Sequence, residues 1–162
     1  MSLQYIIDAY NLINHPAFSP VKNRSQNLKI SFLSFIRKHK LTGSTKNKII
    51  IVFDGFEPSL DAPYSEEGVL FIYSRNISAD EKIKMLIEES ANRKQITVVS
   101  NDRQVQFMTG VLGAKFISIE RFTEAINRNA SKERGFEEDQ KKNISFVQMQ
   151  QINEELKARW LK

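Results

Sequence analysis

The sequence predicts an α/β fold with a central, mostly parallel five-stranded sheet and helices on both faces. Short apolar runs rich in Ile, Val and Phe read as strands, and helical patterns separate most of them. The apolar runs are continuous, as expected of strands that are buried on both faces. The chain has 162 residues, enough for one domain with a sizeable core and too few for two.

The first predicted strand is the apolar run Tyr5 to Ile7, which ends at the carboxylate of Asp8. In open parallel sheets the functional site lies outside the carboxyl ends of the strands, where the strand order reverses. Asp8 is therefore placed where chemistry is expected, and Asn11 follows about one helical turn later. Asp is also a common helix N-cap, so a purely structural role for Asp8 stays open.

A basic helix is predicted over about residues 25–39, after a segment whose two prolines forbid a helix. This region has no acidic residue, and basic side chains give the predicted helix a basic exterior. They are Arg24, Lys29, Arg37, Lys38 and Lys40. Two interpretations stay open: a solvated face whose C-terminal charges complement the helix dipole, or a track for the phosphate backbone of a nucleic acid.

The second predicted strand, Lys48 to Phe53, again ends at an acid, Asp54. The third strand is predicted at Val69 to Tyr73. Residues 56–67 between them contain prolines and several acids, and we expect an irregular segment that could act as a mobile flap over the site.

A capping-box spacing, Ser78 followed by Glu81, predicts a helix with Ser78 as its N-cap. Asp80 then lies in the first turn, where an acid suits the helix dipole without any further function. A metal-binding role for Asp80 stays equally open.

The remaining elements repeat the pattern of strand and helix. A fourth strand is predicted from Gln95 to Ser100, and Asn101 and Asp102 follow it at the start of a helix. That helix reaches Leu112 and is closed by Gly113, a typical C-cap residue. A short fifth strand over residues 115–118 and a helix over residues 120–128 complete the predicted domain, residues 1–128.

The composition changes in residues 129–162. Residues 130–143 are dense in charged side chains and predict a linker or a solvated helix, while residues 145–162 regain an amphipathic helical pattern that includes Trp160. This helix is expected to pack back on the domain. The alternative is a docking helix for a partner, with Trp160 as its anchor.

The net charge is +5 and the pI about 9.4, which favours a polyanionic partner such as RNA or DNA. The chain has no cysteine, which excludes disulfides and thiolate sites. No apolar run approaches the roughly 18 residues that span a bilayer. We therefore expect a cytoplasmic protein without a membrane partner.

Four acids lie just beyond strand ends or at helix starts, on what should be one edge of the sheet. They are Asp8, Asp54, Asp80 and Asp102. Carboxylate oxygens are the ligands that Mg²⁺ and Mn²⁺ prefer, and clustered carboxylates repel one another unless a cation lies among them. His15 and His39 are too isolated to suggest a His-based triad, and the chain has no glycine-rich phosphate loop.

Four motifs together resemble the YacP-like NYN domain family of the PIN-like ribonuclease superfamily, in their order and spacing over about residues 3–127. They are Ile6 to Asn11, Val52 to Gly55, Ser78 to Asp80 and Val98 to Asp102. The resemblance implies a PIN-like, Rossmannoid three-layer sandwich with the strand order 3-2-1-4-5. It also implies a ribonuclease that depends on Mg²⁺ or Mn²⁺, in a branch that includes proteins acting on RNA at the ribosome.

The resemblance also implies roles for individual residues. Asp8, Asp80 and Asp102 would bind the metal, Asn11 would hold the site or a metal-bound water, and Asp54 would be a supporting acid. Secondary candidates are Ser78, Asn101 and Arg103. The chain departs from many relatives at Ala9, where they have glycine, and in the first long helix, where PIN proteins often place another acid.

The function expected from these observations is cleavage of RNA by an endoribonuclease, with ribosome-bound mRNA as one candidate substrate. The alternative is a non-catalytic RNA-binding or ribosome-binding module on the same scaffold. A metal-dependent phosphatase of the haloacid dehalogenase type is disfavoured, because the position of its second acid is Tyr10 here. The oligomeric state is not predicted.

Overall fold

The computed structural model describes residues 1–18, 27–58, 64–124, 126–128 and 132. The chain divides into two units, Met1–Ala125 and Ile126–Lys162. The predicted linker and C-terminal helix, residues 129–162, lie outside the described residues except for Lys132. Part of the expected flap, residues 59–63, lies outside them too.

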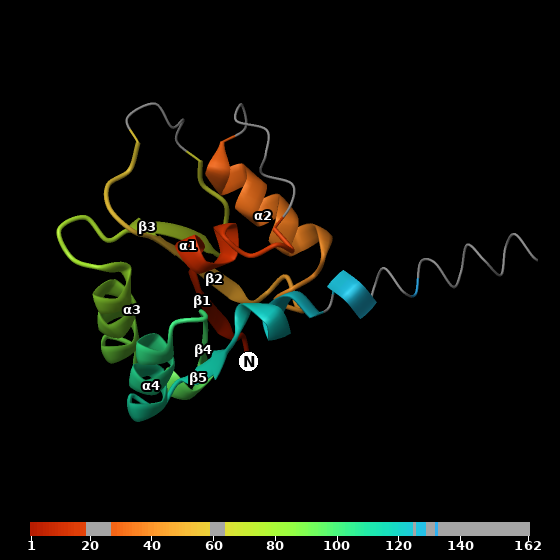
Figure 1. The fold of residues 1–162 in the computed structure, drawn as a ribbon. Helices are drawn as coiled ribbons and strands as arrows, with labels where there is room; N and C mark the ends of the chain where they lie inside the picture. The colour runs from red at the N-terminus through yellow and green to blue at the C-terminus, as the bar shows by residue number, and fades with distance from the viewer. Residues whose placement is uncertain (19–26, 59–63, 125, 129–131, 133–162) are drawn as a thin grey trace, which may run out of the picture. The chain divides into compact units, whose positions relative to one another are not determined.

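Five parallel strands form one sheet in the order β3-β2-β1-β4-β5 (Figure 1). The strands are β1 Gln4–Asp8, β2 Lys48–Phe53, β3 Val69–Tyr73, β4 Ile96–Val99 and β5 Lys115–Ile117. The predicted fold class and strand order are confirmed. The central strand is β1. The strand order therefore reverses beside the carboxyl end of β1, where Asp8 lies.

Helices follow the strands in the described part of the chain. They are α1 Ala9–Ile13, α2 Leu28–Lys38, α3 Ala79–Glu88, α4 Arg103–Val111 and the 3₁₀ helix η2 Arg93–Gln95, and residues 119–124 and 126–128 are also helical. The predicted capping box of α3 is confirmed, since Ser78 and Glu81 form both of its hydrogen bonds. In α2, predicted from about residue 25, the helix begins at Leu28 and Asn27 is its N-cap. None of the described helices is long and apolar enough to cross a membrane.

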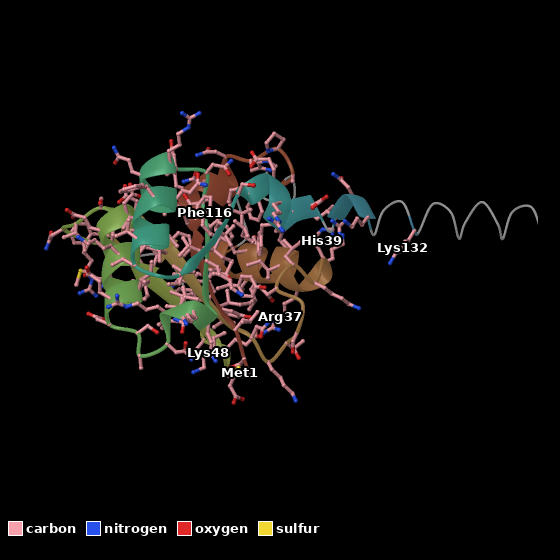
Figure 2. The ribbon with its side chains drawn as sticks, turned by 90° about the horizontal axis from the view of Figure 1, so that it is seen from below. Met1, Arg37, His39, Lys48, Phe116 and Lys132 are labelled. Atoms are coloured by element: carbon pink, nitrogen blue, oxygen red, sulfur yellow. The ribbon has the colours of Figure 1, made fainter. Side chains whose placement is uncertain are left out.

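The two faces of the sheet bury different cores. One face packs against α3 and α4 through aliphatic side chains, including Ile6, Val52 and Ile83. The other carries an aromatic cluster with α2, in which the ring centroids of Phe32 and Phe53 lie 5.6 Å apart. Helices α3 and α4 on one face and α2 on the other therefore give a three-layer arrangement, and Figure 2 shows side chains filling the space around the sheet.

Strand alternation decides which face the first acid points to. Ile6 packs in the α3–α4 core, and Asp8 lies two residues further along the same strand. Side chains two residues apart on a strand share a face of the sheet. The side chain of Asp8 is therefore directed to the face on which α3 and α4 begin.

Candidate functional site

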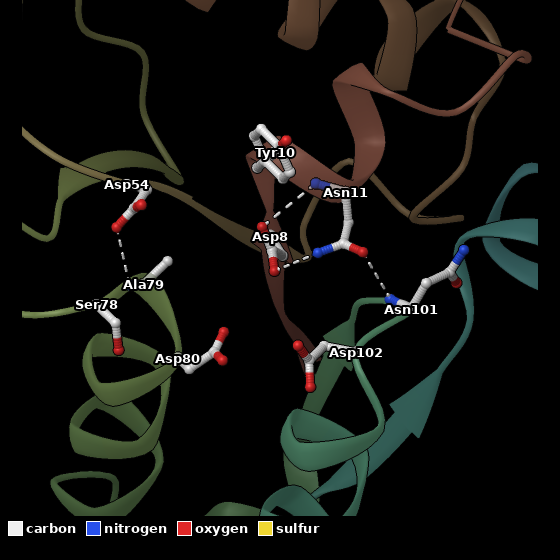
Figure 3. Close-up of a pocket in the computed structure, with 9 residues that line it drawn as sticks. All are labelled: Asp8, Tyr10, Asn11, Asp54, Ser78, Ala79, Asp80, Asn101 and Asp102. Atoms are coloured by element: carbon white, nitrogen blue, oxygen red, sulfur yellow. Dashed lines mark hydrogen bonds between the residues drawn. The ribbon is translucent and has the colours of Figure 1, made fainter.

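A pocket of about 470 Å³ opens at the carboxyl ends of β1, β2 and β4 (Figure 3). It is lined by Asp8, Tyr10, Asn11, Asp54, Ser78, Ala79, Asp80, Asn101 and Asp102. The four acids that the sequence places at strand ends and helix starts thus line one pocket. They come from parts of the chain up to 94 residues apart, and the sheet order brings them together.

Asp8 is the most deeply buried of these acids, with only 3% of its surface exposed. Its Oδ2 accepts hydrogen bonds from Asn11 Nδ2 at 2.7 Å and from Ser100 Oγ at 3.3 Å. Burial raises the pKa of the Asp8 carboxyl, although hydrogen bonds from Asn11 and Ser100 act in the opposite direction. Asp8 also caps α1 by accepting a hydrogen bond from the backbone N–H of Asn11. The same residue therefore caps a helix and lines the pocket.

Asp102 likewise caps a helix and lines the pocket. As the N-cap of α4, its Oδ1 accepts hydrogen bonds from the backbone N–H groups of Gln104 at 2.7 Å and Val105 at 3.2 Å. Its own backbone N–H donates to Ser100 Oγ at 3.1 Å. Because only Oδ1 is used by the cap, the Asp102 carboxylate can still offer its second oxygen to the pocket.

Ser100 connects these two acids and was missed by sequence reasoning. It is fully buried at the end of β4, where its hydroxyl donates to Asp8 and accepts from the backbone of Asp102. The only signal in the sequence is a hydroxyl residue directly after a buried strand and before Asn101 and Asp102.

Asp54 holds the start of α3. Its Oδ1 accepts hydrogen bonds from Ser74 Oγ at 3.1 Å and from the backbone N–H of Ala79 at 3.2 Å. Ala79 directly precedes Asp80, so this contact fixes where the helix presents Asp80. The role of Asp54 as a supporting acid stays a prediction.

Asp80 faces the other acids across the pocket (Figure 3). Burial raises the pKa of the Asp80 carboxyl, and the negative charges of Asp102, Asp8 and Asp54 raise it further. The other three acids are therefore close enough to repel its charge. Ser78, a secondary candidate, acts as the N-cap of α3 and also lines the pocket.

A hydrogen-bonded chain links Asp8 to the surface. Asn11 Oδ1 accepts from the backbone N–H of Asn101 at 3.3 Å, and Asn101 Nδ2 donates to Glu120 Oε1 at 2.8 Å. His15 Nε2 lies 3.6 Å from the same Glu120 oxygen. Asn11 is thus oriented from both sides, and His15 has a carboxylate partner that its position in the sequence did not reveal.

The donor set of the pocket fits a hydrated divalent cation. All four acids offer oxygen ligands, and none of them forms an ion pair with a basic side chain among the described residues. In that same part of the chain no three acidic or histidine side chains are close enough to hold an ion directly. Mg²⁺ typically keeps several waters and uses few protein ligands, so the wider spacing suits an ion held partly through water.

The predicted basic exterior of α2 is wrong for Lys29. Lys29 is only 4% exposed, its Nζ forms an ion pair with Glu57, and it lies 5.6 Å from the centroid of the Tyr73 ring. Its long aliphatic stem suits this buried position, and Glu57 compensates its charge. Lys29 is therefore a structural residue in this fold and offers no free charge to a phosphate.

The other basic candidates differ in their surroundings. Arg37 forms an ion pair with Glu66 and is half-buried, whereas Lys38 is exposed at the end of α2. Arg103 is exposed at the first position of α4, next to Asp102. Arg24 lies outside the described residues. RNA contacts by Arg37, Lys38, Arg103 and Arg24 stay predictions.

Comparisons with known proteins agree with this architecture. No curated protein matches the chain. It is similar to a crystal structure of a tryptophan-to-leucine variant of Rae1 (YacP) from Bacillus subtilis, with a TM-score of 0.57 and 26% identity over 83% of this chain and 80% of that one. A second Rae1 (YacP) structure from Bacillus subtilis has a TM-score of 0.55 and 21% identity, covering 98% of this chain and 95% of the other.

The similarity extends to the family level. Residues 5–162 match the model of the YacP-like NYN domain, which is almost the whole chain. The strand order agrees with the resemblance seen in the sequence motifs. The chain therefore belongs to the YacP-like NYN domain family, a family of PIN-like nuclease domains.

Proposed function

We propose that this protein is a divalent-metal-dependent endoribonuclease. The observation that carries the proposal is one pocket lined by four carboxylates that have no basic partner among the described residues. Unpaired carboxylates held together cost free energy unless a cation joins them. Membership of a nuclease family supports a phosphodiester as the substrate of such a site.

Asp8, Asp80 and Asp102 would hold the metal ion, either Mg²⁺ or Mn²⁺. When bound there, such an ion supplies an activated water and neutralises charge that builds on a phosphodiester under attack. Asp8 contributes a carboxylate that is kept in place by Asn11 and Ser100. Asp54 contributes by positioning Asp80 through Ala79.

The preferred substrate is RNA, with ribosome-associated mRNA as the more specific candidate. The chain carries a net charge of +5, which favours association with a polyanion. The exposed basic residues Lys38 and Arg103 are available to bind phosphates. A cytoplasmic location, expected from the composition, stays a prediction.

One observation favours the alternative, a non-catalytic RNA-binding or ribosome-binding module. The acids of the described residues are not arranged as a direct ligand cage. A pure binder of RNA gains nothing from four unpaired carboxylates at its site, because their charge repels phosphates. We therefore favour the nuclease.

The test is a cleavage assay on a mixed RNA pool with purified full-length protein in Mn²⁺, in Mg²⁺ and in EDTA. The control proteins are Asp8→Asn/Asp102→Asn and Glu88→Gln, since Glu88 is an exposed acid on α3 that does not line the pocket. The proposal predicts metal-dependent cutting by the wild type and by Glu88→Gln, and none by the double variant.

A negative result on free RNA leads to the same assay on translating ribosomes. Cutting there would establish a nuclease that needs the ribosome. Binding of RNA or ribosomes without cutting in any metal would instead identify the binding module.

A further inference from the structure

Tyr10 is unlike the other three tyrosines of the chain. Tyr5, Tyr64 and Tyr73 each pack against a phenylalanine ring, at centroid distances of 6.2, 6.1 and 4.9 Å. Tyr10 is 68% exposed and, among the described residues, has neither a ring partner nor a hydrogen bond to its hydroxyl. Packing of the domain therefore gives no reason for an aromatic side chain at this position.

The position of this ring is tied to the site. Tyr10 lines the pocket together with the four acids, and Figure 3 shows it at the rim beside Asp8. It is the second residue of α1, and the backbone there is held by the N-cap contact from Asn11 to Asp8. The ring is thus presented next to a buried carboxylate by a backbone that is fixed on either side.

An exposed aromatic face beside a phosphodiester-binding site has a specific use. Bases of unpaired RNA can splay out and stack on aromatic side chains, and such stacking tolerates any base. Bases inside a duplex already stack on their neighbours, so their faces are not available to a protein ring. A ring at the rim of the pocket can therefore select the form of the RNA without reading its sequence.

We propose that the Tyr10 ring stacks on the base next to the scissile phosphate and so restricts the site to single-stranded RNA. This inference rests on the proposed function, because it concerns RNA at the same pocket. It adds a residue that contacts the base and a physical reason why an unpaired strand is bound. Tyr10 binds and orients the nucleotide, while the carboxylates lie on the phosphate side.

The chain offers a matched control for this ring. Phe107 on α4 is 75% exposed and lines none of the described pockets. Replacing either ring by alanine removes an exposed aromatic group from a helix, with little effect on packing. Only the Tyr10 variant removes a ring from the pocket.

The first experiment measures binding by fluorescence anisotropy, with a short labelled single-stranded RNA and its duplex. It uses full-length protein in the Asp102→Asn background, so that the RNA stays intact. The expected result is tighter binding of the single strand, weakened about 5- to 160-fold by Tyr10→Ala, since stacking on one aromatic side chain contributes about 1–3 kcal/mol per base. Tyr10→Phe and Phe107→Ala should bind as the unaltered background does.

A matched oligomer that lacks its bases identifies the contact. If the ring stacks on a base, Tyr10→Ala weakens binding of normal RNA but causes no further loss with the baseless oligomer. In the wild-type background, the same variant should raise KM for single-stranded RNA more than it lowers kcat, because the ring binds substrate and does not touch the reacting atoms.

Four results would overturn the inference. They are equal binding by Tyr10→Ala and the unaltered background, equal affinity for single strand and duplex, a loss in Tyr10→Phe as large as in Tyr10→Ala, or failure to bind either RNA. Metal-dependent cleavage by the wild type would leave the proposed nuclease standing in each of these cases, so the two failures are distinguishable.

Discussion

Charged side chains on the α2 face of the sheet form ion pairs, whereas those on the α3–α4 face do not among the described residues. On the α2 face, Lys29 pairs with Glu57 and Arg37 pairs with Glu66. On the α3–α4 face, Asp8, Asp54, Asp80 and Asp102 line a pocket without any ion pair among the described residues. Both sets looked functional in the sequence, one as a basic track for RNA and the other as a metal site.

Whether a charged side chain has a partner within the fold, rather than its presence alone, indicates how the protein uses it. The buried ammonium of Lys29 is compensated within the fold, so its charge serves stability. The charges of the four acids are left uncompensated, and burial, together with repulsion from the other three acids, raises the pKa of Asp80. Such unfavourable repulsion among carboxylates is expected at a site where a bound ligand offsets it.

The largest effect is expected for Asp102, which both caps α4 and lines the pocket. Asp102→Asn should reduce cleavage by more than about 100-fold, because it removes a charged ligand, while Asn caps α4 as well as Asp does. Asp102→Ala should lose cleavage equally and also lose about 1 kcal/mol of unfolding free energy with the cap. Single-turnover cleavage and urea unfolding would measure both.

Unchanged cleavage by Asp102→Asn would contradict a site role for this acid and leave only the cap. Asp102 on the α3–α4 face would then serve stability, as the paired charges on the α2 face do.

The α2 face is tested by Glu57→Gln. This change leaves the buried Lys29 ammonium without its anionic partner and should lower the unfolding free energy by about 1–3 kcal/mol. Chemical denaturation measures it, with Glu67→Gln as the control, because Glu67 is exposed and has no ion pair among the described residues. Equal stability of the two variants would mean that the pair contributes nothing.

A smaller effect concerns pH and Asp80. Its pKa in the folded protein is raised above the ordinary value of 3.8, so its protonated form contributes stability below that pH, and this contribution is lost as the pH rises through the raised value. In EDTA, Asp80→Asn should therefore melt at a higher temperature than the wild type at neutral pH. The difference should vanish toward pH 3.8.

Thermal melts of both proteins across this pH range make the measurement, with Glu88→Gln as the matched acid on the same helix. A melting temperature of Asp80→Asn at or below that of the wild type at neutral pH would show that the Asp80 carboxylate carries no unfavourable charge.

The smallest expected effect is that of Lys38, which is exposed at the end of α2. Lys38→Ala should weaken RNA binding only slightly and reduce its salt dependence by about one counterion. Binding titrations at several salt concentrations test this, with the exposed Lys94 of η2 as the matched control in Lys94→Ala. Equal salt slopes for wild type and Lys38→Ala would exclude Lys38 from the RNA-binding surface.

Much of the fold was predictable because its signals are local. Continuous apolar runs gave the strands, and the pair Ser78 and Glu81 gave the start of α3. The positions of Asp8 and Asp102 followed from strand ends. Ala9 causes no backbone strain, because its φ is not positive.

The rest depended on contacts that no local pattern encodes. Lys29 and Glu57 lie 28 residues apart, so a basic residue on a helix could not be recognised as buried and paired. Ser100 and Asp8 lie 92 residues apart, and their hydrogen bond depends on the pairing of β1 with β4. The exposure of Tyr10 also depends on the fold, in which the other three tyrosines pack against phenylalanine rings and Tyr10 does not.

The most direct measurement is the binding of Mn²⁺ by isothermal titration calorimetry. It compares the wild type with Asp8→Asn, Asp80→Asn and the control Glu88→Gln. If the pocket holds a divalent cation, the wild type and Glu88→Gln bind Mn²⁺ saturably, and the two pocket variants bind it at least about tenfold more weakly. Equal binding by all four proteins, or no binding by any, would contradict a metal site built from these acids.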